Sequence, residues 1–241
     1  MTRRLSHACP IVLALVACTP TEAPTDTGAA PIAPLSPDEE HYGTTYEQLT
    51  LDWYAWTVEQ PVTNNPAFDE TGEDCGVGQT GDVWMLAGSF TSPTVSRTCT
   101  VPADKAIFFP MINYYGCQQL YEAYGLEFIL DDEIAWMTAL GDYVSELHAS
   151  VDGQLLADPF RYQIGPTQFS VDLPEEDNFL QHFGLEIKGT MDPCVTSGYW
   201  MLLEPLPAGE HTVNFGGTFD WATEDSADDF NNDNTYALTV E

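Results

Sequence analysis

The sequence predicts a mainly β fold, a β-sandwich of jelly-roll or immunoglobulin-like type with two short decorating helices. Short apolar or alternating segments recur along the chain, and turns rich in glycine and proline separate them. One of these segments, residues 106–112, is apolar on both faces, which is typical of a strand in the middle of a sandwich. Helical periodicity is found in two stretches, 44–59 and the later half of 127–140.

The first expected helix covers residues 44–59. Thr44 and Glu47 form a capping-box pattern at its start, and Pro61 ends it. Its two tryptophans are interpreted as core anchors rather than as a ligand platform. The apolar positions fall on one face at steps of three and four residues, and they are Tyr46, Leu49, Trp53 and Trp56.

The second expected helix lies in the later half of residues 127–140. Asp131 or Asp132 is expected to cap it. Its apolar stripe consists of Ile134, Met137 and either Ala139 or Leu140.

The strands are expected between turns with recognisable chemistry. Asp152-Gly153 is a strong hairpin signal, and Pro110 is expected to mark a strand end or a bulge. Residues 205–209 are expected to be the turn of a C-terminal hairpin. Residues 179–190 are assigned no element. The expected strands are residues 83–87, 94–101, 106–112, 144–151, 154–156, 160–164, 168–173, 198–204, 210–216 and 235–240.

The N-terminus has the layout of a secretory signal over residues 1–17. Arg3 and Arg4 precede a short apolar run, residues 11–16, which is too short to span a bilayer. The run ends in Leu15-Val-Ala-Cys18, which resembles the lipobox of bacterial lipoproteins. That resemblance implies cleavage before Cys18 and acylation of its thiol. A cleaved signal without lipid remains the main alternative.

Residues 18–40 are expected to form the lipidated cysteine and a disordered Thr/Pro-rich tether, followed by a single β-rich domain, residues 41–241. Thr19, rather than Asp, follows the cysteine, and the resemblance then favours the outer membrane where one exists. We therefore expect a protein of the bacterial cell envelope, held to a membrane by its lipid.

The chain after residue 17 is strongly acidic. It has 38 Asp and Glu residues and only four Lys and Arg, which gives a net charge of −34 with histidine neutral. Such a field repels DNA, RNA and anionic headgroups, so nucleic-acid binding is excluded. A solvated, highly charged surface is the preferred interpretation, and calcium loading is the alternative.

The cysteines predict two disulfides. With Cys9 in the signal and Cys18 in the lipobox, an even number remains, which in an exported chain is typical of disulfides. Four cysteines allow three pairings, and the preferred one joins Cys75 to Cys99 and Cys117 to Cys194. Zinc is disfavoured, because no C-x-x-C occurs and the histidines are scattered.

Several stretches after residue 44 together resemble a group of uncharacterised bacterial secreted proteins. The resemblance implies a shared exported domain, and it lends no catalytic residues. The stretches are Trp53-x-x-Trp56 with Asn65-Pro66, Asp69-x-Thr71-Gly72-x-x-Cys75, Gln79-x-Gly81-x-Val83-Trp84-x-Leu86-Ala87-Gly88, Arg97-x-Cys99-x-Val101-Pro102, Lys105-Ala106-x-Phe108-Phe109-Pro110, Gly198-Tyr199-Trp200 and Pro207-x-Gly209-x-His211-x-Val213-x-Phe215-Gly216-Gly217.

Two binding sites are candidates. The loop 225–234 offers oxygen ligands suited to calcium, although it lacks the glycine and distal glutamate of an EF-hand; an exposed acidic loop is the alternative. Aromatic rings with nearby acids or amides are typical of glycan binding. The candidate calcium ligands are Asp225, Asp228, Asp229 and Asp233, and the candidate glycan-binding rings are Tyr114, Tyr115, Tyr121, Tyr124 and Trp221.

The chain therefore predicts a lipid-anchored binding or structural module of the cell surface, with a glycan or an envelope protein as its partner. No catalytic residue is assigned, and no G-x-S-x-G occurs. The alternative is a secreted hydrolase acting on polysaccharide, which needs a cleft with two facing carboxylates.

Overall fold

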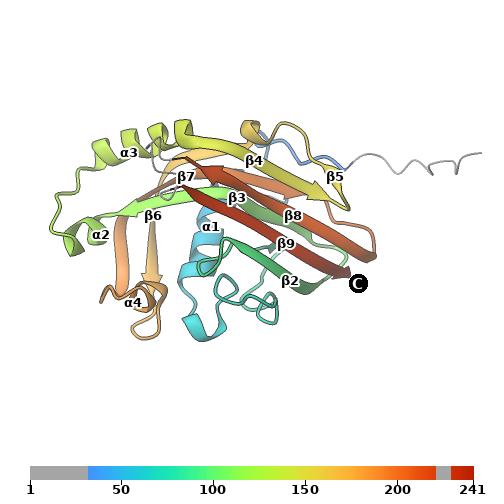
Figure 1. The fold of residues 1–241 in the computed structure, drawn as a ribbon, viewed down its shortest axis with the longest axis horizontal. Coiled ribbons are helices and arrows are strands. Elements are labelled where there is room, and N and C mark those ends of the chain that lie inside the picture. Colours follow the sequence, from blue (N-terminus) through green and yellow to red (C-terminus); the bar gives the residue numbers. More distant parts are fainter. Residues whose placement is uncertain (1–31, 221–228) are drawn as a thin grey trace, which may run out of the picture. The chain divides into compact units, whose positions relative to one another are not determined.

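The structure is a computed structural model, and it describes residues 32–220 and 229–241. Its two sheets pack against each other as a β-sandwich, which confirms the predicted fold class (Figure 1). The helices are α1 (Tyr46–Val58), α2 (Gln118–Ala123), α3 (Leu130–Ala139) and α4 (Phe179–His182). The strands are β1 (Val83–Met85), β2 (Thr94–Val101), β3 (Ala106–Cys117), β4 (Val144–Val151), β5 (Gln154–Leu155), β6 (Gln163–Leu173), β7 (Gly189–Leu203), β8 (Gly209–Phe219) and β9 (Phe230–Val240).

The two sheets have the strand orders β1-β3-β7-β6 and β2-β9-β8-β4-β5. Two of the pairs are parallel, β1 with β3 and β2 with β9, and the others are antiparallel. The last strand of the chain, β9, thus lies between β2 and β8. Within the described residues, no helix has both the length and the apolar character needed to cross a bilayer.

The first sheet is apolar on both faces because it has a packing partner on each side. Phe108 of β3 stacks on Trp200 of β7, with ring centroids 5.4 Å apart, and also contacts Tyr46 of α1. Its neighbour Phe109 points the other way and stacks on Phe215 of β8 at 4.6 Å. The layers are therefore α1, the first sheet and the second sheet, in that order.

Helix α1 is one of the two predicted helices that accompany the sandwich, and its buried face packs on the first sheet. Trp53 is 2% exposed, and its ring lies 5.1 Å from that of Trp200. The interpretation of its tryptophans as core anchors is confirmed. The N-cap is Thr45 rather than Thr44, since Thr45 Oγ1 accepts the N–H of Gln48 at 3.1 Å. Thr44 is unavailable because its backbone pairs with that of His41.

Helix α3 lies within the predicted stretch, but neither aspartate caps it. Ile129 occupies the N-cap position without a side-chain hydrogen bond, and Asp131 and Asp132 lie in the first turn. Carboxylates in a first turn still interact favourably with the positive end of the helix dipole. The local sequence therefore stabilises this helix end through charge rather than through a cap.

The turn at residues 205–209 does not form the predicted C-terminal hairpin. Strand β7 pairs with β3 and β6, whereas β8 pairs with β4 and β9 in the other sheet. Sheets in a sandwich lie about 10 Å apart, and five residues can span about 16 Å. The segment between β7 and β8 is therefore a crossover between the layers.

Two other strand predictions also need correction. Residues 159–162 form a 3₁₀ turn that begins with Pro159, so the strand expected at 160–164 starts only at Gln163. Strand β3 continues five residues past its expected end, with a change of register between Pro110 and Ile112. Pro110 thus marks a bulge, the second of its two predicted roles. The hairpin at Asp152-Gly153 is confirmed, with both φ angles positive at 52° and 78°.

The domain begins earlier than predicted, because residues 32–40 are ordered and packed rather than part of a loose tether. The N–H of Leu35 donates to the carbonyl of Leu202 at 2.8 Å, and the Tyr46 hydroxyl donates to the carbonyl of Leu35. Strand β6 stops pairing with β7 at Tyr199, so this segment occupies the edge of β7 beyond that point.

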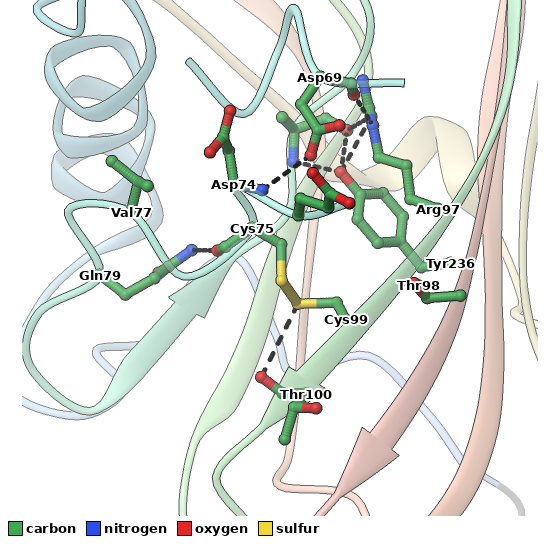
Figure 2. The surroundings of a disulfide bond; sticks show 12 residues. Asp69, Asp74, Cys75, Val77, Gln79, Arg97, Thr98, Cys99, Thr100 and Tyr236 are labelled. Carbon is green, nitrogen blue, oxygen red and sulfur yellow. Dashed lines mark hydrogen bonds between the residues drawn. A yellow bond between two sulfur atoms is a disulfide. The ribbon is translucent and has the colours of Figure 1, made fainter. Parts of the chain in front are cut away.

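Both predicted disulfides are present. Cys117 and Cys194 are opposite each other in the β3–β7 ladder, so this bond joins two strands that already pair. Cys75 lies in the long segment before β1, and its bond to Cys99 attaches that segment to β2 (Figure 2). The bond between Cys75 and Cys99 therefore fixes a part of the chain that has little regular structure of its own.

Candidate functional site

A pocket forms beside β3 because β1 is short. β1 pairs only with Ala106–Phe108, and in the described part of the chain no strand continues along that side of β3. The space is enclosed instead by α1, by residues 88–90 and by the start of β9. The resulting cavity has a volume of about 240 Å³, and we call it the β3 pocket.

The walls of the β3 pocket are aromatic and uncharged. None of the described residues that line it is charged, although 18% of the chain is. The side chains that border it include Trp53, Tyr54, Phe90, Asn113, Tyr115 and Phe230. Rings with a few amide and hydroxyl groups are the usual lining of a small-molecule site.

The orientation of the Asn113 amide is fixed by α1. Its Nδ2 donates to the Tyr54 hydroxyl at 2.8 Å, and that hydroxyl donates in turn to the carbonyl of Tyr114 at 3.4 Å. Asn113 Oδ1 accepts no hydrogen bond from any described residue, and it is not among the fully buried polar atoms. It is therefore an acceptor available to a ligand.

The hydroxyl of Tyr115 is the second available group. It too forms no hydrogen bond with the described residues and is not fully buried. Burial, and then the neighbouring Tyr54, raise the pKa of Tyr115 well above its ordinary value. Burial likewise raises the pKa of Tyr54. Both phenols therefore remain protonated and neutral at physiological pH.

The floor of the pocket is held by an amide pair on β9. Asn232 Nδ2 donates to the carbonyl of Met111 at 3.3 Å, and its Oδ1 accepts from the amide of Asn234. Both asparagines are buried. Since both ends of the Asn232 amide are engaged, it shapes the pocket rather than offering a group to a ligand.

The predicted glycan-binding rings do not form one platform. Tyr114 and Tyr115 both border the pocket, but the Tyr114 ring packs on Phe219 and the Tyr115 ring on Tyr54, on opposite faces of β3. Tyr121 donates to Glu133. Tyr124 is 68% exposed and lies outside the pocket. Trp221 lies outside the described residues.

The predicted calcium ligands are only partly described. Asp225 and Asp228 lie outside the described residues, whereas Asp229 and Asp233 lie within them. Asp233 Oδ1 accepts from Asn214 Nδ2 at 2.6 Å and lies 3.4 Å from His148 Nε2. Within the described residues, no three acidic, histidine or cysteine side chains gather as a metal site would require.

Sequence reasoning missed most of the pocket, although one signal was present. Along β9, Asn232 and Asn234 occupy the same inward face as Tyr236 and Leu238. Amides at core positions of a strand are unusual, because a buried polar group must find partners. That alternation could have indicated a polar site at this end of the sandwich.

A second hollow, of about 560 Å³, lies between α1 and residues 78–85. It is bordered by the exposed carboxylates of Asp52, Glu59 and Asp82, the last of which pairs with Lys105 at 3.7 Å. Asp52 lies on α1, and Glu59 is the C-cap residue of that helix. A glycoside hydrolase needs two facing carboxyl groups, and the hydrolase alternative stays a prediction.

His211 of β8 forms an ion pair with Asp152. Its Nδ1 lies 2.7 Å from Asp152 Oδ2, and its Nε2 lies 2.8 Å from the carbonyl of Pro207. Partial burial lowers the pKa of His211, but these two hydrogen bonds outweigh it and raise the pKa overall. Partial burial raises the pKa of Asp152, but the Thr212 N–H and His211 outweigh it and lower it overall.

The pair should stabilise the fold most between about pH 4 and pH 6.5. The histidine contribution is lost as the pH rises from there through its raised pKa, and the aspartate contribution is lost as the pH falls through its lowered pKa. Asp152→Asn should therefore lower the melting temperature at pH 5.5 more than at pH 8. The effect is about 1 kcal/mol or less, since Asp152 is half exposed. Equal losses at the two pH values would contradict this assignment.

Comparison with protein-family models, with curated proteins and with solved structures finds no match for this chain. The predicted resemblance to bacterial secreted proteins therefore stays a prediction.

Proposed function

We propose that the chain is a lipid-anchored protein of the bacterial cell envelope whose domain binds a neutral sugar residue in the β3 pocket. The observation that carries the binding proposal is an aromatic pocket whose described lining residues are all uncharged, in a chain of net charge −32. Where acids are so abundant, an uncharged cavity favours an uncharged ligand.

The charge of the protein narrows the class of ligand. A negative field of this strength repels anionic ligands. A cationic ligand would gain little here, because the described lining has no carboxylate and burial of an unpaired charge is unfavourable. A neutral ligand with apolar ring faces and a few polar groups fits best. A sugar residue has that character, because its C–H faces pack on aromatic rings.

The size of the pocket limits how much of a glycan enters it. Pockets for drug-sized ligands measure about 300–1,000 Å³, and the β3 pocket is smaller at about 240 Å³. It suits one residue at the end or branch of a glycan, with the remainder of the glycan outside.

Titration of the mature protein with neutral mono- and disaccharides tests this proposal. Trp53 borders the pocket, so tryptophan fluorescence reports binding, and calorimetry gives the affinity. We expect Phe230→Ala, which removes a half-exposed ring from the wall, to weaken binding about ten-fold. Tyr124→Ala is the matched control, because it removes an exposed ring outside the pocket. No binding of any neutral sugar, or an equal loss in both variants, would overturn the proposal.

The anchor is a separate part of the proposal and rests on Leu15–Cys18. We expect Cys18→Ser to move the protein from the membrane fraction to the soluble fraction of the envelope. Stable anchoring needs more than one acyl chain, and mass spectrometry of the mature N-terminus would detect them on Cys18. An unmodified N-terminus beyond residue 18 would contradict the anchor and favour a simple cleaved signal. It would leave the sugar-binding proposal intact.

A further inference from the structure

The β3 pocket offers a ligand few hydrogen-bonding side chains. The Tyr54 hydroxyl is engaged as donor and acceptor, and the indole N–H of Trp53 donates to the carbonyl of Leu86 at 2.9 Å. Ser89 Oγ accepts from two backbone N–H groups, at 3.2 and 3.1 Å, and lies 3.3 Å from Thr91 Oγ1. The Tyr114 hydroxyl has no partner but is fully buried, with its ring packed on Phe219 on the other face of β3. Among the described lining side chains, Asn113 Oδ1 and the Tyr115 hydroxyl therefore remain for a ligand.

With only these two hydrogen-bonding groups, the pocket suits some parts of a sugar better than others. A hydroxyl-bearing edge buried in the pocket would leave several hydroxyl groups without partners. Each such group costs about 1–3 kcal/mol. An acetamido group is different, because it combines one N–H, one carbonyl and one methyl. That set matches one acceptor, one donor and an apolar wall.

The structure determines which of the two groups accepts a hydrogen bond from a ligand and which one donates. Asn113 presents its oxygen because its nitrogen is held by Tyr54. The Tyr115 hydroxyl keeps its proton at neutral pH, so it can donate to a ligand carbonyl. The rings of Phe90 and Phe230, on the wall of the pocket, supply apolar surface for a methyl group.

We infer that the β3 pocket takes the acetamido group of an N-acetylated sugar, with its N–H donating to Asn113 Oδ1 and its carbonyl accepting from the Tyr115 hydroxyl. This inference rests on the proposed function, and it names the chemical class within it. The remainder of the sugar ring lies toward the mouth of the pocket.

The test compares N-acetylglucosamine with glucose on the mature protein. We expect N-acetylglucosamine to bind about ten-fold more tightly, as two additional hydrogen bonds allow. Saturation-transfer NMR should show the strongest transfer at the acetyl methyl protons. Tyr115→Phe keeps the ring and its packing, so it should fold normally and reduce the preference to about two- to three-fold. Asn113→Leu should reduce it likewise, and Phe230→Ala should weaken both sugars.

The outcomes separate this inference from the function on which it rests. Glucose binding as tightly as N-acetylglucosamine would overturn the inference and leave the sugar-binding proposal standing. Binding of neither sugar would overturn the inference, and it would overturn the proposed function too once the other neutral sugars also failed. A preference that survives Tyr115→Phe and Asn113→Leu unchanged would show that the acetamido group lies elsewhere, which also overturns the inference.

Discussion

Replacing Arg97 with methionine should lower the free energy of unfolding by about 3 kcal/mol. The Arg97 side chain is 2% exposed and donates to the backbone carbonyls of Asp69, Ala87 and Gly88 at 2.6, 2.9 and 3.1 Å (Figure 2). It also donates to the Tyr236 hydroxyl at 2.9 Å. Methionine preserves most of the volume but leaves these acceptors without that donor.

The expected loss is limited by a cost that Arg97 already carries. Its Nη2 is buried without a hydrogen-bond partner, and none of the ion pairs within the described residues involves it. The charge of Arg97 is compensated by its hydrogen bonds and by the Tyr236 ring, whose centroid lies 5.4 Å from Arg97 Cζ, and not by a carboxylate of the described residues. Removal of a buried charge without an ion-pair partner returns part of the free energy. The expected loss in free energy of unfolding, about 3 kcal/mol, is therefore smaller than the full cost of leaving several buried carbonyls without a hydrogen-bond donor.

Urea unfolding with the disulfides intact measures the effect. Arg161→Met is the matched control, since Arg161 pairs with Asp38 on the surface and both side chains are more than half exposed. The control should cost less than about 1 kcal/mol. Arg97→Lys should also destabilise, because an ammonium group cannot reproduce the planar geometry of the guanidinium donors. A methionine variant as stable as the control would contradict the role assigned to Arg97.

Removing the disulfide between Cys117 and Cys194 should cost more than removing the one between Cys75 and Cys99. The bonds close loops with sequence separations of 77 and 24 residues. Loop-closure entropy predicts about 4.5 and about 3.5 kcal/mol for them, a difference of about 1 kcal/mol. The measurement is urea unfolding of the two double alanine variants.

Which disulfide costs more stability when removed shows whether loop-closure entropy or native contacts determine the loss. Cys117 and Cys194 belong to a ladder that persists without the bond, whereas Cys75 lies in a segment with little regular structure. A larger cost for the shorter loop would contradict the entropic account. It would show that the attachment of residues 65–82 to β2 matters more, and the loss should then be non-additive with Arg97→Met, since Arg97 binds the same segment through Asp69.

Elements whose signals are local were predicted well from the sequence. Strand β2 has the expected bounds, and its alternation of exposed and buried residues is regular from Thr94 to Val101. The turn at Asp152-Gly153 needs two positive φ angles, which these residue types tolerate. In both cases, the residues that decide the structure are neighbours in the chain.

The sequence did not predict the layer to which each element belongs. Residues 205–209 have the chemistry of a turn, but the sequence does not tell whether a turn joins strands of one sheet or of two. The apolar stripe of α1 shows that one face is buried, and not that the helix covers a sheet with a second sheet behind it. Each depends on contacts between residues far apart in the chain.

The β3 pocket was unpredictable for the same reason. It exists because β1 ends after three residues while β3 continues to Cys117. Its wall brings together Trp53, Phe90, Asn113 and Phe230, which come from four separate segments. The inward-facing asparagines of β9 are the one local sequence signal of the pocket. The predicted rings Tyr114 and Tyr115 do border it, together with Trp53, which was assigned to the core.

The position of β9 has a consequence for the way the protein is made. A chain that emerges N-terminus first synthesises β2 early, yet β2 acquires its sheet partner only when the last eleven-residue strand arrives. Until then the edge of β2 that pairs with β9 has no strand beside it. The incomplete chain therefore has an unpaired strand edge at β2 until β9 is made. Deletion of β9 should for that reason cause aggregation rather than give a slightly smaller folded domain.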